Sequence, residues 1–260
     1  MLLGTLFAEK ATEGFVVDQN IQGSYNPLGL QLVTKMYYSV PLVHLPGVLW
    51  ESTRIDFGIQ NNLSPGYDLA GIFINIEPIA VFNLTLTAQA TSYFKALGYG
   101  FYSLSGYGAG FDGPALDALT SQNAFGYIVS AAPTFKIAAG PIVVLDTGTF
   151  TYFNAGGGNG YFYERIGNTV LAGSDIELAN QAYVLTTILP GLLCGVNDSL
   201  LYVPASGYVS HRINAIGIYT IKLTGTFSVY AALTAGTFLA DRYFQYKLYA
   251  AGQAGVTLRL

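Results

Sequence analysis

Residues 243–260 read YFQYKLYAAGQAGVTLRL, and this stretch decides the fold class. Every second residue from Phe244 onward is apolar or glycine, whereas the alternate positions include polar side chains such as Gln253 and Arg259. A strand places alternate residues on opposite faces, and a helix cannot separate them in this way. The C-terminal stretch therefore predicts a long strand with one apolar face.

The same alternation recurs through residues 30–42, 50–60 and 80–91. These runs hold 10 or more residues, longer than the ~5–6 of typical soluble strands. Only 10% of the 260 residues are charged, whereas 52% are hydrophobic; a soluble domain carries ~25% charged residues. Because lipid offers no hydrogen bonds, a sheet within it must close on itself. The pattern predicts a transmembrane β-barrel.

Membrane-spanning helices are the alternative to strands, and two charge-free stretches are long enough to be considered. Residues 178–197 contain Pro190 and Gly191 in their second half, and residues 223–240 are rich in Thr, Gly and aromatic residues. A spanning helix needs ~20 predominantly apolar residues. Loops rich in Lys and Arg on one side, the usual mark of helical topology, are also missing. Strands are therefore favoured in both stretches.

The connections between the predicted strands set their number. Tight turns are predicted at residues 44–47, 77–79, 138–141, 190–191 and 223–225, and long, partly Gly/Tyr-rich loops at 61–67, 96–123, 154–177 and 204–207, with a shorter one near Asp241. Bacterial barrels place short turns in the periplasm and long loops outside. Reading back from the C-terminus gives eleven strands, and residues 13–22 supply a twelfth. An all-β, antiparallel up-and-down barrel of twelve strands follows, with ten or fourteen left open because residues 177–202 alternate poorly.

Residues 13–260 are expected to form this one domain. Residues 1–12 are expected to be a periplasmic arm or the remnant of a signal, with an export signal absent from this numbering.

Over nearly its whole length, the chain resembles the porin-like members of the bacterial outer-membrane β-barrel class. Its last residues, Val256–Leu260, look like the end that the assembly machinery of that class recognises. The size is similar to that of twelve-stranded channels such as the nucleoside channel and the acidic-oligosaccharide porins. The resemblance implies a location in the outer membrane, with outer-membrane lipid, lipopolysaccharide and the assembly machinery as partners.

Placing the polar strand faces inward predicts which charges line the lumen or its rims. These candidates are Lys35, Arg54, Asp56, Glu77, Lys95, Lys136, Asp146, Arg212, Lys222, Lys247 and Arg259. Eight of them are bases and three are acids, so a chain of net charge −4 is predicted to enclose a positive lumen. Charged rings in a low-dielectric bore select solutes by sign. The hypothesis is a passive channel for small polar or anionic solutes.

The alternative to a channel is a closed structural barrel, filled by internal ion pairs such as Arg54 with Asp56, whose loops bind a partner. A secreted soluble β-sandwich is a third, weaker interpretation.

Enzymatic chemistry is not expected from this sequence. The only histidines are His44, in a predicted turn, and His211, whose neighbour Ser210 should point to the opposite face. No Gly-x-Ser-x-Gly motif occurs, and Asp175 and Glu177 are expected in a solvated loop. The single Cys194 makes no metal or redox motif. No cofactor, metal or nucleic-acid partner is therefore predicted.

Overall fold

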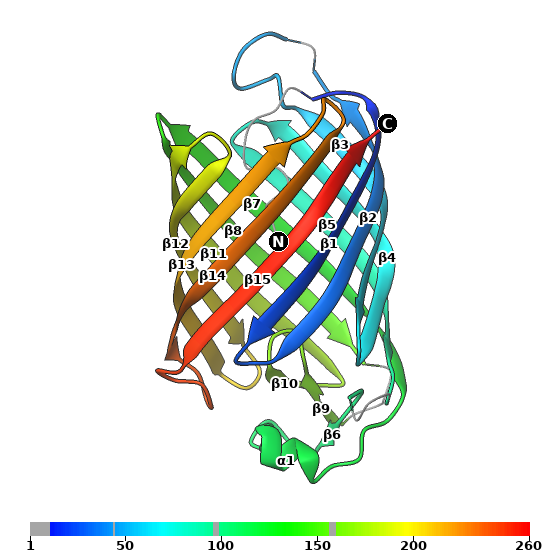
Figure 1. The fold of residues 1–260 in the computed structure, drawn as a ribbon. Coiled ribbons are helices and arrows are strands. Elements are labelled where there is room, and N and C mark those ends of the chain that lie inside the picture. Colours follow the sequence, from blue (N-terminus) through cyan, green and yellow to red (C-terminus); the bar gives the residue numbers. More distant parts are fainter. Residues whose placement is uncertain (1–10, 44, 96–98, 156–159) are drawn as a thin grey trace.

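The computed structural model describes residues 11–43, 45–95, 99–155 and 160–260, and its fold is a closed antiparallel barrel of twelve strands (Figure 1). The barrel strands in chain order are β1 (Gly14–Tyr25), β2 (Gly29–Pro41), β3 (Arg54–Ser64), β4 (Tyr67–Ile79), β5 (Phe82–Tyr93), β7 (Ala124–Ala139), β8 (Ile142–Asn154), β11 (Ser174–Leu189), β12 (Leu192–Val203), β13 (Tyr208–Lys222), β14 (Phe227–Ala240) and β15 (Leu248–Arg259). Each strand pairs with its neighbour in this order, and β15 pairs with β1. The predicted all-β, up-and-down barrel of twelve strands is confirmed.

The closing seam joins the two ends of the barrel sequence. β1 and β15 pair without a break from Val16 opposite Arg259 to Tyr25 opposite Ala250. The ladder leaves no exposed sheet edge, as a lipid environment requires. The last strand begins at Leu248, however, later than the alternation suggested. Tyr246 adopts a left-handed backbone with φ of 61°, which ends the extended conformation, so the alternation before Leu248 belongs to a loop.

The two ends of the barrel differ in their connections. We call the end where β1 begins and β15 finishes the turn end, at the top of Figure 1, and the opposite end the loop end. Two-residue turns at 80–81, 140–141 and 190–191 lie at the turn end, and the long connections 94–123 and 155–173 lie at the loop end. The stretches considered as helices, residues 178–197 and 223–240, lie mainly in β11–β12 and β14. No helix among the described residues is long and apolar enough to cross a membrane.

Several predicted connections were placed wrongly. The turn expected at 44–47 is a twelve-residue connection over 42–53, and His44 itself lies outside the described residues. The loop expected at 61–67 is only the turn 65–66, because polar residues at the end of β3 remain in the ladder. Of the Gly/Tyr-rich loops, residues 96–98 and 156–159 lie outside the described residues, as do residues 1–10 of the predicted arm.

Burial identifies the two faces of each strand. In β8, Val143, Leu145 and Thr147 are buried while the residues between them are exposed. The outward positions are mostly apolar, and they include Ile59, Ile72, Val129 and Leu233, each at least 45% exposed. This distribution is that of a barrel whose outer surface contacts lipid.

A small second sheet covers the loop end (Figure 1). It consists of β6 (Ser103–Leu104), β9 (Tyr161–Glu164) and β10 (Thr169–Ala172), in the order β10-β9-β6. The short helix α1 (Gly113–Asp117) follows β6 in the same long connection. We call residues 99–112 and 160–173, which contain β6, β9 and β10, the cap.

Candidate functional site: the barrel interior and its cap

The interior wall is polar along β1 to β7 and is held together by hydrogen bonds between neighbouring strands. The amide of Asn75 donates to Asp56 at 2.9 Å, and the hydroxyl of Thr85 donates to Asn75 at 2.9 Å. The hydroxyls of Thr87 and Ser130 form another such bond. Buried or half-buried polar groups of this kind are stable only when they have partners. The network therefore fixes the inward side chains in defined positions.

A buried ion cluster lies in the turn-end half of this wall. Glu77 of β4 has no exposed surface, and its carboxylate is 2.7 Å from Nζ of Lys136 and 3.4 Å from the guanidinium of Arg54. Asp56 also pairs with Arg54, at 3.2 Å. The cluster joins β3, β4 and β7, which are not all neighbours in the sheet. The internal pairing of Arg54 with Asp56 is the one that the closed-barrel alternative anticipated.

The opposite wall in the same half is apolar. Its inward side chains form one buried cluster: Val143, Leu145, Leu185, Leu193, Ile216, Ile218 and Ala232. These residues come from β8, β11, β12, β13 and β14. Near the turn end both faces of these strands are apolar, and in β12 the polar residues Asn197 and Ser199 face inward while Asp198 faces outward, so polarity did not separate the two faces of residues 177–202.

The predicted lumen residues fall into three groups. Lys35, Arg54, Asp56, Glu77, Lys136, Arg212, Lys222 and Arg259 lie on inward strand positions. Lys95 and Lys247 lie beyond the strands, in the connections at the loop end. The assignment of Asp146 to the lumen is wrong. Its side chain is exposed on the outward face of β8, where it accepts a hydrogen bond from Asn180 at 2.7 Å.

Three inward acids were missed by the sequence interpretation. Asp18 of β1 accepts a hydrogen bond from Thr257 at 2.7 Å, and Asp175 and Glu177 lie buried on β11 rather than in a solvated loop. The inward charges of the barrel strands are therefore nearly balanced: Lys35, Arg54, Lys136, Arg212, Lys222 and Arg259 against Asp18, Asp56, Glu77, Asp175 and Glu177. The strongly positive interior expected from sequence does not appear on these strands.

Aromatic packing joins the cap to the barrel wall. Phe162 of β9 is 1% exposed and stacks on Phe101 with ring centroids 5.2 Å apart. Tyr93, at the end of β5, meets both rings edge-on. Inward residues of the wall and residues of the cap form one buried cluster: Tyr67, Leu69, Tyr93, Phe101, Ile128, Phe153, Ala155, Phe162, Leu171 and Val203. The cap is thus packed against the inner surface of the loop end.

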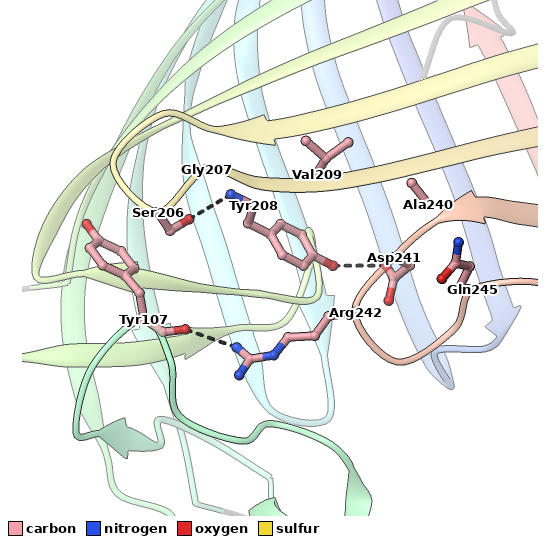
Figure 2. A pocket seen from close by; sticks show the side chains of 9 residues that line it. All are labelled: Tyr107, Ser206, Gly207, Tyr208, Val209, Ala240, Asp241, Arg242 and Gln245. Carbon is pink, nitrogen blue, oxygen red and sulfur yellow. Dashed lines mark hydrogen bonds between the residues drawn. The ribbon is translucent and has the colours of Figure 1, made fainter.

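Hydrogen bonds join the connection between β14 and β15 to the barrel strand β13 and to the cap. Asp241, in the connection between β14 and β15, accepts from the hydroxyls of Tyr208 at 2.9 Å and Ser210 at 2.8 Å. Figure 2 shows Tyr208 pointing at Asp241 and Arg242 reaching toward Tyr107. The Arg242 guanidinium donates to the carbonyl oxygen of Tyr107 at 3.0 Å. These contacts surround an open pocket of about 420 Å³.

Replacing Asp241 by alanine should loosen the connection between β14 and β15, whose Arg242 holds the cap. The carboxylate also accepts from two backbone N–H groups, those of Tyr243 and Phe244. Losing a charged acceptor that serves several donors costs at least about 2 kcal/mol. We expect faster tryptic cleavage after Arg242 in proteoliposomes, with unchanged heat-dependent gel mobility of the barrel. Asp117→Ala, an exposed acid of α1, is the matched control, and equal cleavage of the two variants would contradict this role of Asp241.

A catalytic site is not assembled around the described histidine. Nε2 of His211 lies 2.9 Å from the carboxylate of Asp198 on the outward face. Ser199 and Ser210 alternate to the buried, inward side, as expected for adjacent strand residues. Among the residues that the structure describes, no group of three or more side chains could hold a metal ion. The pair is a polar contact on the outward face of β12 and β13.

Comparison with known proteins finds similar solved structures but no family. No protein-family model and no curated protein matches the sequence. Among solved structures, the chain is similar to the NanC porin, with a TM-score of 0.48 and 9% identity over 94% of this chain and 100% of that one. It is similar to the KdgM porin, with a TM-score of 0.42 and 9% identity over 94% and 99%. It is also similar to the translocator domain of the autotransporter NalP from Neisseria meningitidis, with a TM-score of 0.46 and 10% identity over 99% and 91%. The identities are 9–10% and each TM-score is below 0.5, so these likenesses carry no conclusion about the function of this chain.

Proposed function

We propose that the protein is a narrow channel of the bacterial outer membrane for small polar solutes, closed at its loop end by the cap. The observation that carries the proposal is the solvent-accessible polar wall inside the barrel. Inward side chains near the middle of the barrel, among them Thr85, Thr87, Ser130 and Gln181, are half-buried rather than sealed. An interior lined by such groups can hold water. The apolar outer face supports contact with outer-membrane lipid and lipopolysaccharide.

The near balance of inward charges argues for weak ion selectivity. Anion preference would need unpaired bases in the bore, but Arg54 and Lys136 are already paired with acids. Neutral polar solutes, rather than anions, are therefore the favoured substrate class. A reversal potential close to zero across a KCl gradient is the expected signature, and a clear anion preference would restore the earlier hypothesis.

A pair of neighbouring substitutions tests the channel. Thr87 points into the barrel from β5, while Leu86 beside it is 40% exposed on the outer face. Thr87→Trp should lower the conductance in planar bilayers severalfold because the indole obstructs the bore, whereas Leu86→Trp should leave it unchanged. Both variants must show the heat-dependent gel shift of a folded barrel. Equal conductance of the two, with folding intact, would reject a path through the interior.

The second candidate is a closed interaction barrel whose loops bind a partner. The aromatic packing between cap and wall favours it, because the buried cluster at the loop end leaves its members almost without exposed surface. A complete lack of conductance in wild type and in a variant with a released cap would support this candidate over the channel.

A further inference from the structure

Two carboxylates meet where the cap touches the barrel wall. Glu164 is the last residue of β9, and Glu177 faces inward from β11. Glu164 is 1% exposed and Glu177 is 8% exposed. A Cβ added to Gly167 would collide with Oε2 of Glu177 and would lie 3.1 Å from Oε2 of Glu164. The two carboxylates therefore flank the same glycine, one from the cap and one from the wall.

No base neutralises this pair among the described residues. The Glu164 carboxylate accepts backbone N–H bonds from Ile166, at 2.9 Å, and from Gly167. Oε2 of Glu177 is buried without a hydrogen-bond partner. The ion pairs found in the described parts of the chain include neither carboxylate.

The other ionisable groups nearby form no ion pair with either carboxylate among the described residues, and the attraction of Arg165 for Glu164 is smaller than the effect of burial. The guanidinium of Arg165 lies over the rings of Tyr99, Tyr102 and Tyr163, at 5.2 to 5.5 Å, and donates to the carbonyl oxygen of Gly100. From the wall, the groups that face the pair are Tyr67 of β4, Tyr93 of β5 and Asp175 of β11. Asp175 is a further acid, which accepts from the hydroxyl of Tyr107 at 2.8 Å. Two adjacent anions in this site would repel each other strongly.

We propose that Glu164 and Glu177 form a proton-operated latch that holds the cap against the barrel wall and releases it when the pair ionises. Glu164 belongs to the cap and Glu177 to the barrel wall, so repulsion between the two carboxylates would push the cap away from the wall. A protonated carboxyl can donate to the other carboxylate and so give the unpartnered Oε2 of Glu177 a hydrogen-bond partner. This inference rests on the proposed channel function and adds a pH-dependent closure of the loop end to it.

The direction of the pH dependence follows from linkage. Burial raises the pKa of Glu164 above its ordinary value, against the smaller opposing effects of the Gly167 and Ile166 N–H groups and Arg165. A carboxyl whose pKa is higher in the closed arrangement than in the solvated open one binds its proton more tightly when closed. The closed arrangement is therefore favoured at low pH and is lost as the pH rises through the raised pKa.

The test compares wild type with Glu177→Gln between acid and mildly alkaline pH. Two readouts are taken on the full chain in lipid: channel open probability, and hydrogen exchange of the β9 and β10 amides. The two proteins are compared at each pH so that the intrinsic pH dependence of exchange cancels. In wild type we expect exchange and opening, relative to the variant, to rise by up to about tenfold per pH unit between the ordinary carboxyl pKa and the raised pKa, and to level off above it. Glu177→Gln keeps the shape, cannot form the second anion and offers an amide donor to Glu164, so its cap should stay closed to higher pH than that of wild type.

The control is Glu51→Gln, an exposed glutamate of the connection between β2 and β3 at the turn end, which should behave as wild type. Equal exchange in wild type and Glu177→Gln at every pH, with both barrels folded, would overturn the latch. A pH-dependent exchange difference without any conductance would uphold the latch and reject the channel instead. A conductance that does not change with pH, together with equal exchange in the two proteins, would reject the latch and uphold the channel.

Discussion

Replacing Glu77 by alanine is expected to destabilise the barrel by about 3–5 kcal/mol, the usual cost of removing one partner from a buried ion cluster. Glu77 is the acid shared by Arg54 and Lys136 and is completely buried. Its removal leaves Lys136 without its acid and Arg54 with Asp56 alone. The free energy of unfolding, measured by urea titration of the barrel in lipid, should fall accordingly. Glu77→Gln should recover little, because an amide supplies no compensating charge.

A double substitution separates the charge from the packing at this site. Glu77→Leu combined with Lys136→Met removes both members of the closest pair, whose atoms are 2.7 Å apart. Replacing a buried ion pair by apolar residues of similar volume is often close to neutral, so the double variant should be more stable than Glu77→Leu alone. Glu51→Ala, at an exposed glutamate, should change stability by less than about 0.5 kcal/mol. If Glu77→Ala behaves like Glu51→Ala, the cluster does not stabilise the barrel.

Replacing Phe162 by alanine is expected to release the cap while leaving the barrel intact. Phe162 is the largest side chain with almost no exposed surface in the structure's described part, and it touches both Phe101 and Tyr93. Removing a buried phenylalanine side chain costs about 3–5 kcal/mol. β9 pairs only with β6 and β10, so this loss falls on the cap and not on the barrel ladder. Faster tryptic cleavage after Arg165 and a severalfold higher conductance should follow.

Phe150→Ala is the matched control for this result. Phe150 lies on β8 but is 45% exposed on the outer face, so its loss should change neither cleavage of the cap nor conductance. Cleavage that increases in Phe162→Ala without any gain in conductance would place the narrowest part of the bore elsewhere, at the ion and apolar clusters of the turn-end half.

The strand number was predictable because alternation is a local property of the backbone. Val256 and Leu258 alternate with Thr257 and Arg259 whatever the rest of the chain does. Loop boundaries were less predictable. Asn61 and Asn62 suggested a loop, yet both pair within the sheet, because a ladder continued beyond the apolar belt tolerates polar side chains.

The sequence by itself determined the all-β class and the apolar outer face and favoured twelve strands over ten or fourteen, since a period of two and a lack of charge act residue by residue. It could not assign Asp146, which lies outward beside Asn180, because polarity alone does not tell which face a strand residue occupies. Only the tertiary structure decided the charge balance of the interior and the closure of its mouth. Both depend on contacts between distant residues, such as Glu77 with Lys136 and Glu164 beside Glu177, and no local pattern encodes which strands and loops will meet across the barrel.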